Sequence, residues 1–175
     1  MFTLVIGGAA SGKSEYAEGL LLAAPGPRYY LATMEPAADA ECRARIRRHR
    51  ALRAGKGFVT VERAVDLAGL RLPAKGNVLL EDLGNLAANE LYSPAGAGPD
   101  GALRAVVEGV LHLRAACRGL VVVSNEIFAG GRDYALGTEA YLRLLADAHR
   151  ALAAEADSVC EVACGLPIYY KGAKP

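Results

Sequence analysis

An eight-residue segment near the start of the chain has the G-x-x-x-x-G-K-S spacing of a phosphate-binding loop. It consists of Gly7, Gly8, Ala9, Ala10, Ser11, Gly12, Lys13 and Ser14. The short apolar run Phe2–Ile6 directly precedes it, so the loop stands where a strand should lead into a helix. A glycine-rich turn with a purely structural role could have the same spacing, but its position behind a strand favours binding of a nucleoside triphosphate.

Each defined position of this spacing has a chemical role in such a loop. Glycines let successive backbone N–H groups curl around phosphates at the positive end of the helix that begins near Lys13. Lys13 is expected to reach the β and γ phosphates, and Ser14 to hold Mg²⁺. An acidic side chain at the end of another strand should complete the metal site.

The apolar run Val78–Glu81 supplies that acid, because it ends in two carboxylates, Glu81 and Asp82. Neighbouring residues on a strand point to opposite faces, so only one of the two should face the phosphates. We favour Glu81 as the metal ligand. In the alternative interpretation Asp82 caps a helix and Glu81 is solvated.

Strand-like runs rich in Val, Ile, Leu and Tyr recur along the chain. They are Phe2–Ile6, Arg28–Thr33, Phe58–Val61, Val78–Glu81, Leu120–Asn125 and Ser158–Cys164. Segments with helical spacing of apolar residues separate most of them, around residues 16–21, 103–113 and 141–152. This alternation predicts an α/β fold with a mostly parallel sheet and helices on both faces, in which ligands bind at the carboxyl ends of the strands.

The remaining segments are expected to be connections and an edge strand. Ser93–Gly101 and Phe128–Thr138 are predicted to be loops. After a turn at Gly165-Leu166-Pro167, the segment Ile168–Lys171 is expected to add an antiparallel edge strand.

Composition limits the classes of function. A chain of 175 residues, 53% of them hydrophobic, is expected to form a single domain over residues 1–175. Its 20 Lys and Arg against 19 Asp and Glu give no reason to expect nucleic acid or an anionic membrane as partner. No run approaches the roughly 18 apolar residues of a membrane span. The start does not resemble a signal peptide and the four cysteines are dispersed, so we expect a cytoplasmic protein with reduced thiols.

The most unusual segment is Asp39–Arg53, which contains six arginines and His49. On a helix Arg45, His49 and Arg53 would lie along one stripe, with an imidazole between two guanidinium groups. Flanking cations keep a histidine neutral, and a neutral ring nitrogen is nucleophilic toward phosphorus. The alternatives are a solvated basic helix and a helix that binds a nucleic-acid backbone.

A second apolar strand also ends in polar residues. Ser124, Asn125 and Glu126 follow Val121–Val123 and are candidate contacts to a ligand, or ordinary turn and capping residues. His112 and His149 lie in apolar helical stripes, where surface or packing roles are expected.

In this order along the chain, the motifs resemble the bifunctional adenosylcobinamide kinase/adenosylcobinamide-phosphate guanylyltransferase family of cobalamin biosynthesis. The resemblance covers nearly the full length. The segments that carry it are the loop at 7–14, Tyr30–Thr33, Asp39-x-Glu41, Arg45-Ile46-x-x-His49-x-x-x-Arg53, Thr60-x-Glu62, Leu79–Glu81, Val123–Glu126, Ala156-Asp157 and Gly165-Leu166-Pro167.

The resemblance implies a P-loop NTPase with a RecA-like sheet, assembled as a homotrimer. It also implies two reactions: phosphorylation of the corrinoid adenosylcobinamide at its aminopropanol hydroxyl, and transfer of GMP from GTP onto that phosphate. His49 matches the guanylylated histidine, and with Lys13 it forms the expected catalytic set. Mg²⁺ would accompany GTP or ATP. Further nucleotide-binding positions implied by the resemblance are Thr33, Met34, Glu35, Arg50, Arg53, Glu62 and Glu81.

The chain differs from the family pattern at several positions. Ala10 replaces an arginine in the loop, and Phe58 replaces a tryptophan. The segments Ile127–Asp133 and Leu142–Arg150 also diverge, on the side expected to contact the corrinoid. A small P-loop kinase for another acceptor, and a nucleotide-sensing homologue without turnover, therefore stay open as alternatives.

Overall fold

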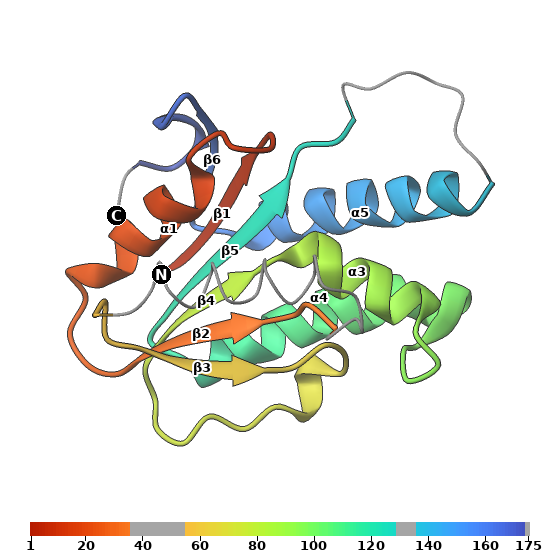
Figure 1. The fold of residues 1–175 in the computed structure, drawn as a ribbon, viewed down its shortest axis with the longest axis horizontal. Helices are drawn as coiled ribbons and strands as arrows, with labels where there is room; N and C mark the ends of the chain where they lie inside the picture. The colour runs from red at the N-terminus through yellow and green to blue at the C-terminus, as the bar shows by residue number, and fades with distance from the viewer. Residues whose placement is uncertain (36–54, 129–135, 174–175) are drawn as a thin grey trace.

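The computed structural model describes residues 1–35, 55–128 and 136–173 (Figure 1). The elements in chain order are β1 (Phe2–Gly7), α1 (Lys13–Leu22), β2 (Arg28–Ala32), β3 (Phe58–Glu62), the 3-10 helix η1 (Leu67–Gly69), β4 (Asn77–Glu81), α3 (Leu83–Tyr92), α4 (Gly98–Ala116), β5 (Gly119–Asn125), α5 (Leu136–Glu155), β6 (Ser158–Ala163) and β7 (Leu166–Lys171). Every strand-like run of the sequence forms a strand. In the described ranges, no helix combines the length and the apolar character that crossing a membrane requires.

The strands form one seven-stranded sheet in the order β3-β2-β4-β5-β1-β6-β7. All neighbouring pairs are parallel except β6 and β7, which are antiparallel. Strand β5 lies between β1 and β4, so the carboxyl ends of these three strands meet at one edge of the sheet (Figure 1). The arrangement confirms the predicted α/β P-loop class with an antiparallel C-terminal edge strand.

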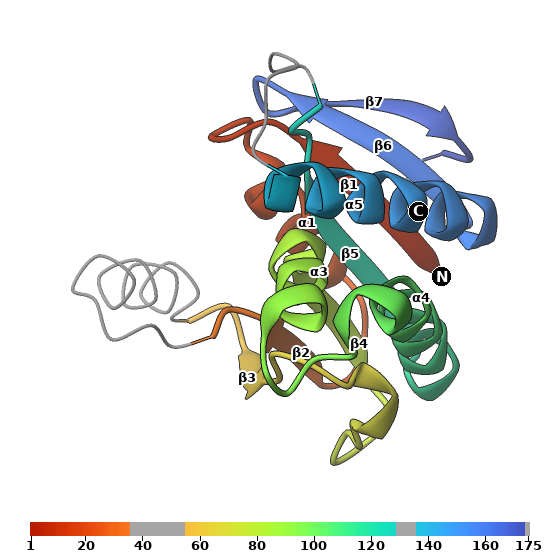
Figure 2. The ribbon, with the colours of Figure 1, turned by 90° about the vertical axis from the view of Figure 1, so that its right-hand side faces the viewer.

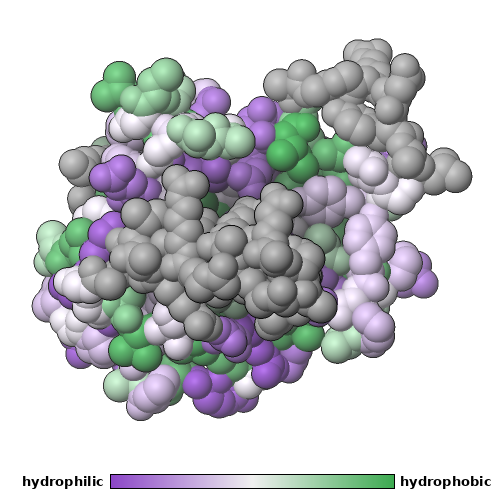
Figure 3. Space-filling view, viewed as in Figure 1, coloured by the Kyte–Doolittle hydropathy of each residue, from purple (hydrophilic) through white to green (hydrophobic). Residues whose placement is uncertain are grey.

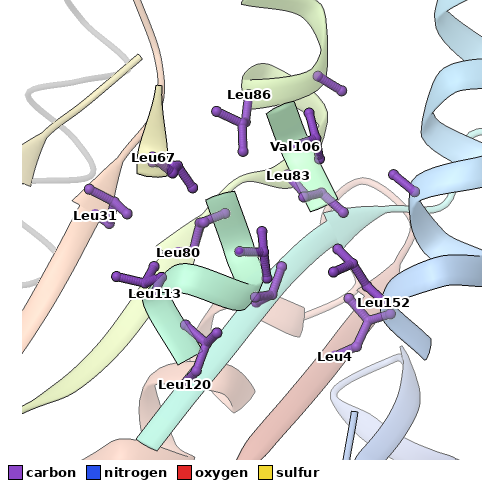
Figure 4. Close-up of a cluster of buried hydrophobic side chains, with 14 of the residues drawn as sticks. Leu4, Leu31, Leu67, Leu80, Leu83, Leu86, Val106, Leu113, Leu120 and Leu152 are labelled. Carbon is purple, nitrogen blue, oxygen red and sulfur yellow. The ribbon is translucent and has the colours of Figure 1, made fainter. Parts of the chain in front are cut away.

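Helices cover both faces of the sheet (Figure 2). On one face Ala17 and Leu21 of α1 pack against alternate strand residues such as Leu79 and Val121. On the other face α3, α4 and α5 enclose the larger core, whose leucines are shown in Figure 4. Burial on both faces explains why the strands are continuous apolar runs rather than alternating ones. Over the visible described surface in Figure 3, hydrophilic and hydrophobic residues are interspersed.

Helix boundaries differ from the sequence expectations in three places. Helix α3 was not among the helices expected from apolar spacing and entered only through the alternative in which Asp82 caps a helix; Leu83, Leu86 and Leu91 bury its apolar side. The predicted loop 93–101 is too long, because α4 already begins at Gly98 with a proline in its first turn, a favoured position. The predicted loop 128–138 is too long as well, since α5 begins at Leu136.

The final turn also lies earlier than expected. Cys164 and Gly165 both have left-handed backbones, with φ of 52° and 77°, as a two-residue hairpin turn requires. Strand β7 therefore begins at Leu166 rather than Ile168 and includes Pro167, which an edge strand tolerates.

His149 of α5 has the packing role expected for it. Its side chain is 9% exposed, its Nε2 lies 2.7 Å from Ser124 Oγ in a hydrogen bond, and its ring meets Phe128 edge-on. Burial lowers the pKa of His149 to about 4, with Glu126 opposing the shift. Ser124 is fully buried in this contact and so does not face the edge where a ligand would bind.

The buried imidazole predicts a specific pH dependence of stability. Its pKa is about 4 in the folded protein, against about 6.5 unfolded, so the unfolded chain binds the extra proton between these values. We expect His149 to remove roughly 2 to 3 kcal/mol of unfolding free energy as the pH falls from 7 to 4. Urea unfolding of wild type and His149→Gln over this range measures the difference. Parallel pH profiles for the two proteins would contradict the prediction.

Candidate nucleotide-binding site

The phosphate-binding loop joins β1 to α1 in a conformation that two of its glycines make possible. A Cβ at Gly7 would lie 2.5 Å from Ser11 Oγ and 2.7 Å from the carbonyl of Val162 on β6. Gly12 has φ of 88° and caps α1 without a side chain. The first N–H groups of α1 therefore open toward the loop, where an anion is stabilised. Ala10 is also left-handed, with φ of 56°.

The turn between β6 and β7 contacts the phosphate-binding loop and stabilises its conformation. The backbone N–H of Gly165 donates to Ser11 O at 2.8 Å, and Ser11 N–H donates to Gly8 O at 3.3 Å. A Cβ at Gly12 would lie only 3.0 Å from Gly165 Cα. Because the turn and the loop are in van der Waals contact, the loop conformation depends on the C-terminal hairpin.

Lys13 and Ser14 open helix α1 and point in different directions. Lys13 is 8% exposed, and its Nζ donates to Gly8 O at 3.0 Å, so its ammonium group is held against the loop. Ser14 Oγ donates to Glu81 Oε1 at 2.6 Å. The structure thus brings together the hydroxyl and the carboxylate that the sequence assigned to one metal site.

The donor chemistry of this pair fits Mg²⁺. A hydroxyl and a carboxylate are hard oxygen ligands, and Mg²⁺ uses one or two protein ligands together with water and phosphate oxygens. Within the described residues no group of three or more His, Cys, Asp or Glu could form a cage for a metal by itself. A metal at Ser14 and Glu81 would therefore need the phosphates of a bound nucleotide.

Asp82 points away from the loop. Its Oδ1 accepts from the Asn85 N–H at 2.6 Å and caps α3, and its Oδ2 accepts from Asn125 Nδ2 at 3.1 Å. The structure thus confirms the helix cap of the alternative interpretation, and Glu81 accepts a hydrogen bond from Ser14. The role of Glu81 as a metal ligand stays a prediction. Asn125 contacts Asp82, and Glu126 Oε1 accepts from the Phe128 N–H at 2.8 Å.

Thr33 has a structural use for its side chain. It is fully buried, and its hydroxyl donates to Asp82 O at 2.8 Å and accepts from Asp82 N–H at 2.9 Å. These two hydrogen bonds hold the backbone between Glu81 and the start of α3 in place. The Thr33 hydroxyl is therefore occupied by the Asp82 backbone. Its role is to hold the Glu81–Asp82 segment in place rather than to contact a ligand.

The other candidates lie farther along the same edge or outside the described chain. Met34 and Glu35 come after Thr33, just beyond the end of β2, and Glu62 ends β3. Ala32 pairs with Glu62 on one side and with Glu81 on the other. The Cα atoms of the two glutamates are therefore about 10 Å apart, which is two strand spacings. The candidates His49, Arg50 and Arg53, with Arg45, lie outside the described residues.

Tyr141 could not be identified as a candidate from the sequence, where it is only one member of an apolar helical stripe. Burial raises the pKa of Tyr141 to about 12, with smaller contributions from Asp82 and Tyr92. A Cβ at Gly84 would lie 2.8 Å from Tyr141 Oη and 3.3 Å from Asp82 Oδ1, so the phenol and the carboxylate are neighbours. Only the packing of α5 against α3 brings the two residues together.

Comparison with solved structures gives distant matches. The P4 protein from bacteriophage phi6 in complex with ADP aligns at 17% identity over 95% of this chain and 53% of that chain, with a TM-score of 0.43. This chain thus spans about half the length of the P4 chain. A KaiC-like protein from Pyrococcus horikoshii OT3 aligns at 12% identity over 91% of this chain and 71% of that chain, with a TM-score of 0.46.

Comparison of sequences gives one informative result. The family model described as cobinamide kinase / cobinamide phosphate guanyltransferase matches residues 3–170, nearly the whole chain. No curated protein sequence matches the chain.

The loop geometry predicts different costs for two glycine substitutions. Gly12→Ala combines a left-handed backbone with a close approach to Gly165, so we expect a loss of about 1 to 2 kcal/mol in unfolding free energy. Gly8→Ala is the matched control, because a Cβ there meets nothing within 4 Å. Urea denaturation at neutral pH measures both, and equal losses would show that the loop does not depend on the left-handed turn.

Proposed function

This chain belongs to the cobinamide kinase / cobinamide phosphate guanyltransferase family, and we propose that it catalyses both reactions through the phosphate-binding loop and His49. Family membership makes the chain a transferase of cobalamin biosynthesis. The first reaction moves a γ-phosphoryl group from GTP or ATP to the cobinamide hydroxyl. The second moves GMP from GTP onto the resulting phosphate.

The contact between Ser14 and Glu81 carries the proposal for the triphosphate site. It joins the first turn of α1 to the end of β4 at 2.6 Å, at the point where the loop would hold the β and γ phosphates. Lys13 lies against the same loop and offsets phosphate charge. Mg²⁺, bound by Ser14 and Glu81, would neutralise charge that develops between the β and γ phosphates. Positioning and charge compensation are what phosphoryl transfer requires from a protein.

For guanylyl transfer we propose His49 as the nucleophile. Its ring nitrogen would form a bond to the α-phosphorus of GTP while the bond to the β-phosphate oxygen breaks and pyrophosphate leaves. An oxygen of cobinamide phosphate would then displace the imidazole and take the GMP group. Arg50 and Arg53 would offset the phosphate charge. These three residues lie outside the described part of the chain, so sequence spacing and family membership support this step.

The remaining site residues are assigned from the resemblance alone. We propose that Met34 and Glu35, which come after β2, and Glu62, which ends β3, contribute to the nucleotide site. The backbone around Thr33 contributes as well. We also propose one nucleotide-binding domain over residues 1–175, acting in the cytoplasm as a homotrimer.

Guanylylation of His49 predicts a labelled protein. Incubation with GTP labelled on the α-phosphate should give an adduct that is labile to acid and stable to alkali, as a phosphoramidate is. The adduct should be lost completely in His49→Ala and kept in His112→Ala, a histidine on α4. Triphosphate binding without any adduct would leave a plain kinase or a nucleotide sensor.

The Ser14–Glu81 pair predicts a loss of turnover that depends on the metal. In Ser14→Ala the kinase kcat at saturating nucleotide should fall about a hundredfold, because one ligand that positions charge at the phosphates is removed. Higher Mg²⁺ should restore part of the activity. Ser158→Ala is the control, since the Ser158 hydroxyl donates to Ala173 O at the opposite end of the sheet. Steady-state kinetics across a Mg²⁺ titration test this, and a wild-type Mg²⁺ profile for Ser14→Ala would contradict it.

A further inference from the structure

A polar cluster lies next to the Ser14–Glu81 pair and takes no part in the nucleotide binding described above. It consists of Asp82, which follows β4 and caps α3, Asn125 at the end of β5 and Tyr141 on α5. A methyl group added at Gly84 would lie 2.8 Å from Tyr141 Oη, 3.3 Å from Asp82 Oδ1 and 3.9 Å from Asn125 Nδ2. Polar atoms from three separate elements therefore converge on one point above the first turn of α3.

The hydrogen-bonding capacity of Asp82 is only partly used. Each carboxylate oxygen accepts one neutral donor, and an ionised carboxylate has about four acceptor sites. In the part of the chain that the structure describes, no lysine or arginine forms an ion pair with Asp82, although the side chain is only 7% exposed. A largely buried carboxylate of this kind favours a further donor, such as a hydroxyl group.

Tyr141 supplies the complementary group. A tyrosine phenol is protonated at neutral pH and can donate a hydrogen bond, and burial raises the pKa of Tyr141 further, to about 12. An alcohol hydroxyl can donate one hydrogen bond and also accept one. Asp82 can accept the first, and Tyr141 can donate the second. Asn125 fixes the orientation of the Asp82 carboxylate from the side of β5.

A cleft leads to the same tyrosine. It has a volume of about 380 Å³ and is lined by Ala88 and Tyr92 of α3 and by Gly137, Thr138 and Tyr141 of α5. Helices α3 and α5 lie side by side here, as Figure 2 shows, and the Tyr92 hydroxyl donates to Gly137 O. The cleft is largely apolar apart from these groups, which suits an organic side arm with one terminal polar group.

Resting on the proposed function, we propose that the Asp82–Asn125–Tyr141 cluster binds the acceptor alcohol of the kinase reaction, with the arm that bears the hydroxyl in the cleft between α3 and α5. Asp82 accepts a hydrogen bond from the hydroxyl and Tyr141 donates one to it. Glu81 and Asp82 are consecutive, with Glu81 turned to the loop and Asp82 to the cluster. The acceptor hydroxyl is thereby held at the carboxyl end of β4, beside the residue that contacts Ser14.

Asp82→Asn tests the carboxylate without removing the helix cap, because asparagine caps as well as aspartate. We expect cobinamide kcat/KM to fall about 10- to 100-fold, as for loss of a charged hydrogen bond to a substrate hydroxyl. The Kd of cobinamide, measured by equilibrium dialysis, should rise by a similar factor. The Kd for Mg-GTP and the yield of labelled adduct should change less than about twofold. Asp66→Asn is the matched control, because Asp66 caps η1 with its side chain and lies outside the cluster.

Gly84→Ala is an independent variant that should keep the fold, because alanine favours a helix and the backbone at Gly84 is not left-handed. Its Cβ would occupy the point of convergence and displace the Tyr141 hydroxyl. We expect an unchanged or raised Tm and at least a tenfold loss of cobinamide affinity, with Mg-GTP binding intact. Wild-type cobinamide affinity in both Gly84→Ala and Asp82→Asn would overturn the inference alone. A wild-type protein that binds Mg-GTP but neither binds nor phosphorylates cobinamide would overturn the proposed function as well.

Discussion

The hydrogen bond between Ser14 and Glu81 depends on parallel strand pairing across the centre of the sheet. Strand β5 pairs with β1 on one side and with β4 on the other, in a register that sets Gly7 opposite Asn125 and Glu81 opposite Val123. Parallel strands end at the same edge of the sheet. The loop after β1 and Glu81 of β4 therefore meet there, although Ser14 and Glu81 are 67 residues apart in the sequence. A shift of β4 by one residue would turn Glu81 to the other face and separate the pair.

The two consecutive carboxylates at the carboxyl end of β4 face different parts of the proposed site. Glu81 faces the loop and α1, while Asp82 faces α3, Asn125 and α5. Thr33 holds the backbone between them with two hydrogen bonds from the buried side. One short stretch of chain therefore supports both the proposed nucleotide site and the proposed acceptor site, and its rigidity fixes how far apart the two ligands lie.

Local sequence patterns predicted much of this site, because they act over a few residues. Continuous apolar runs predicted the strands, and the spacing of glycines with Lys13 and Ser14 predicted the loop. Helix α3 was missed because its burial depends on packing against α4 and α5, and Tyr141 was missed because only that packing brings it to Asp82. His49, Arg50 and Arg53 lie outside the described residues, so their proposed role continues to rest on spacing and family membership.

The contact of Gly165 with Ser11 has a consequence for biosynthesis of the protein. Strand β1 is synthesised before both of its neighbours, β5 and β6, which lie more than a hundred residues later in the sequence. Contacts between segments so distant in sequence form late in folding. During translation the phosphate-binding loop therefore lacks these contacts until β5, β6 and the turn at Gly165 have been synthesised, so a nascent chain stalled before them would carry the nucleotide motif without a working binding site.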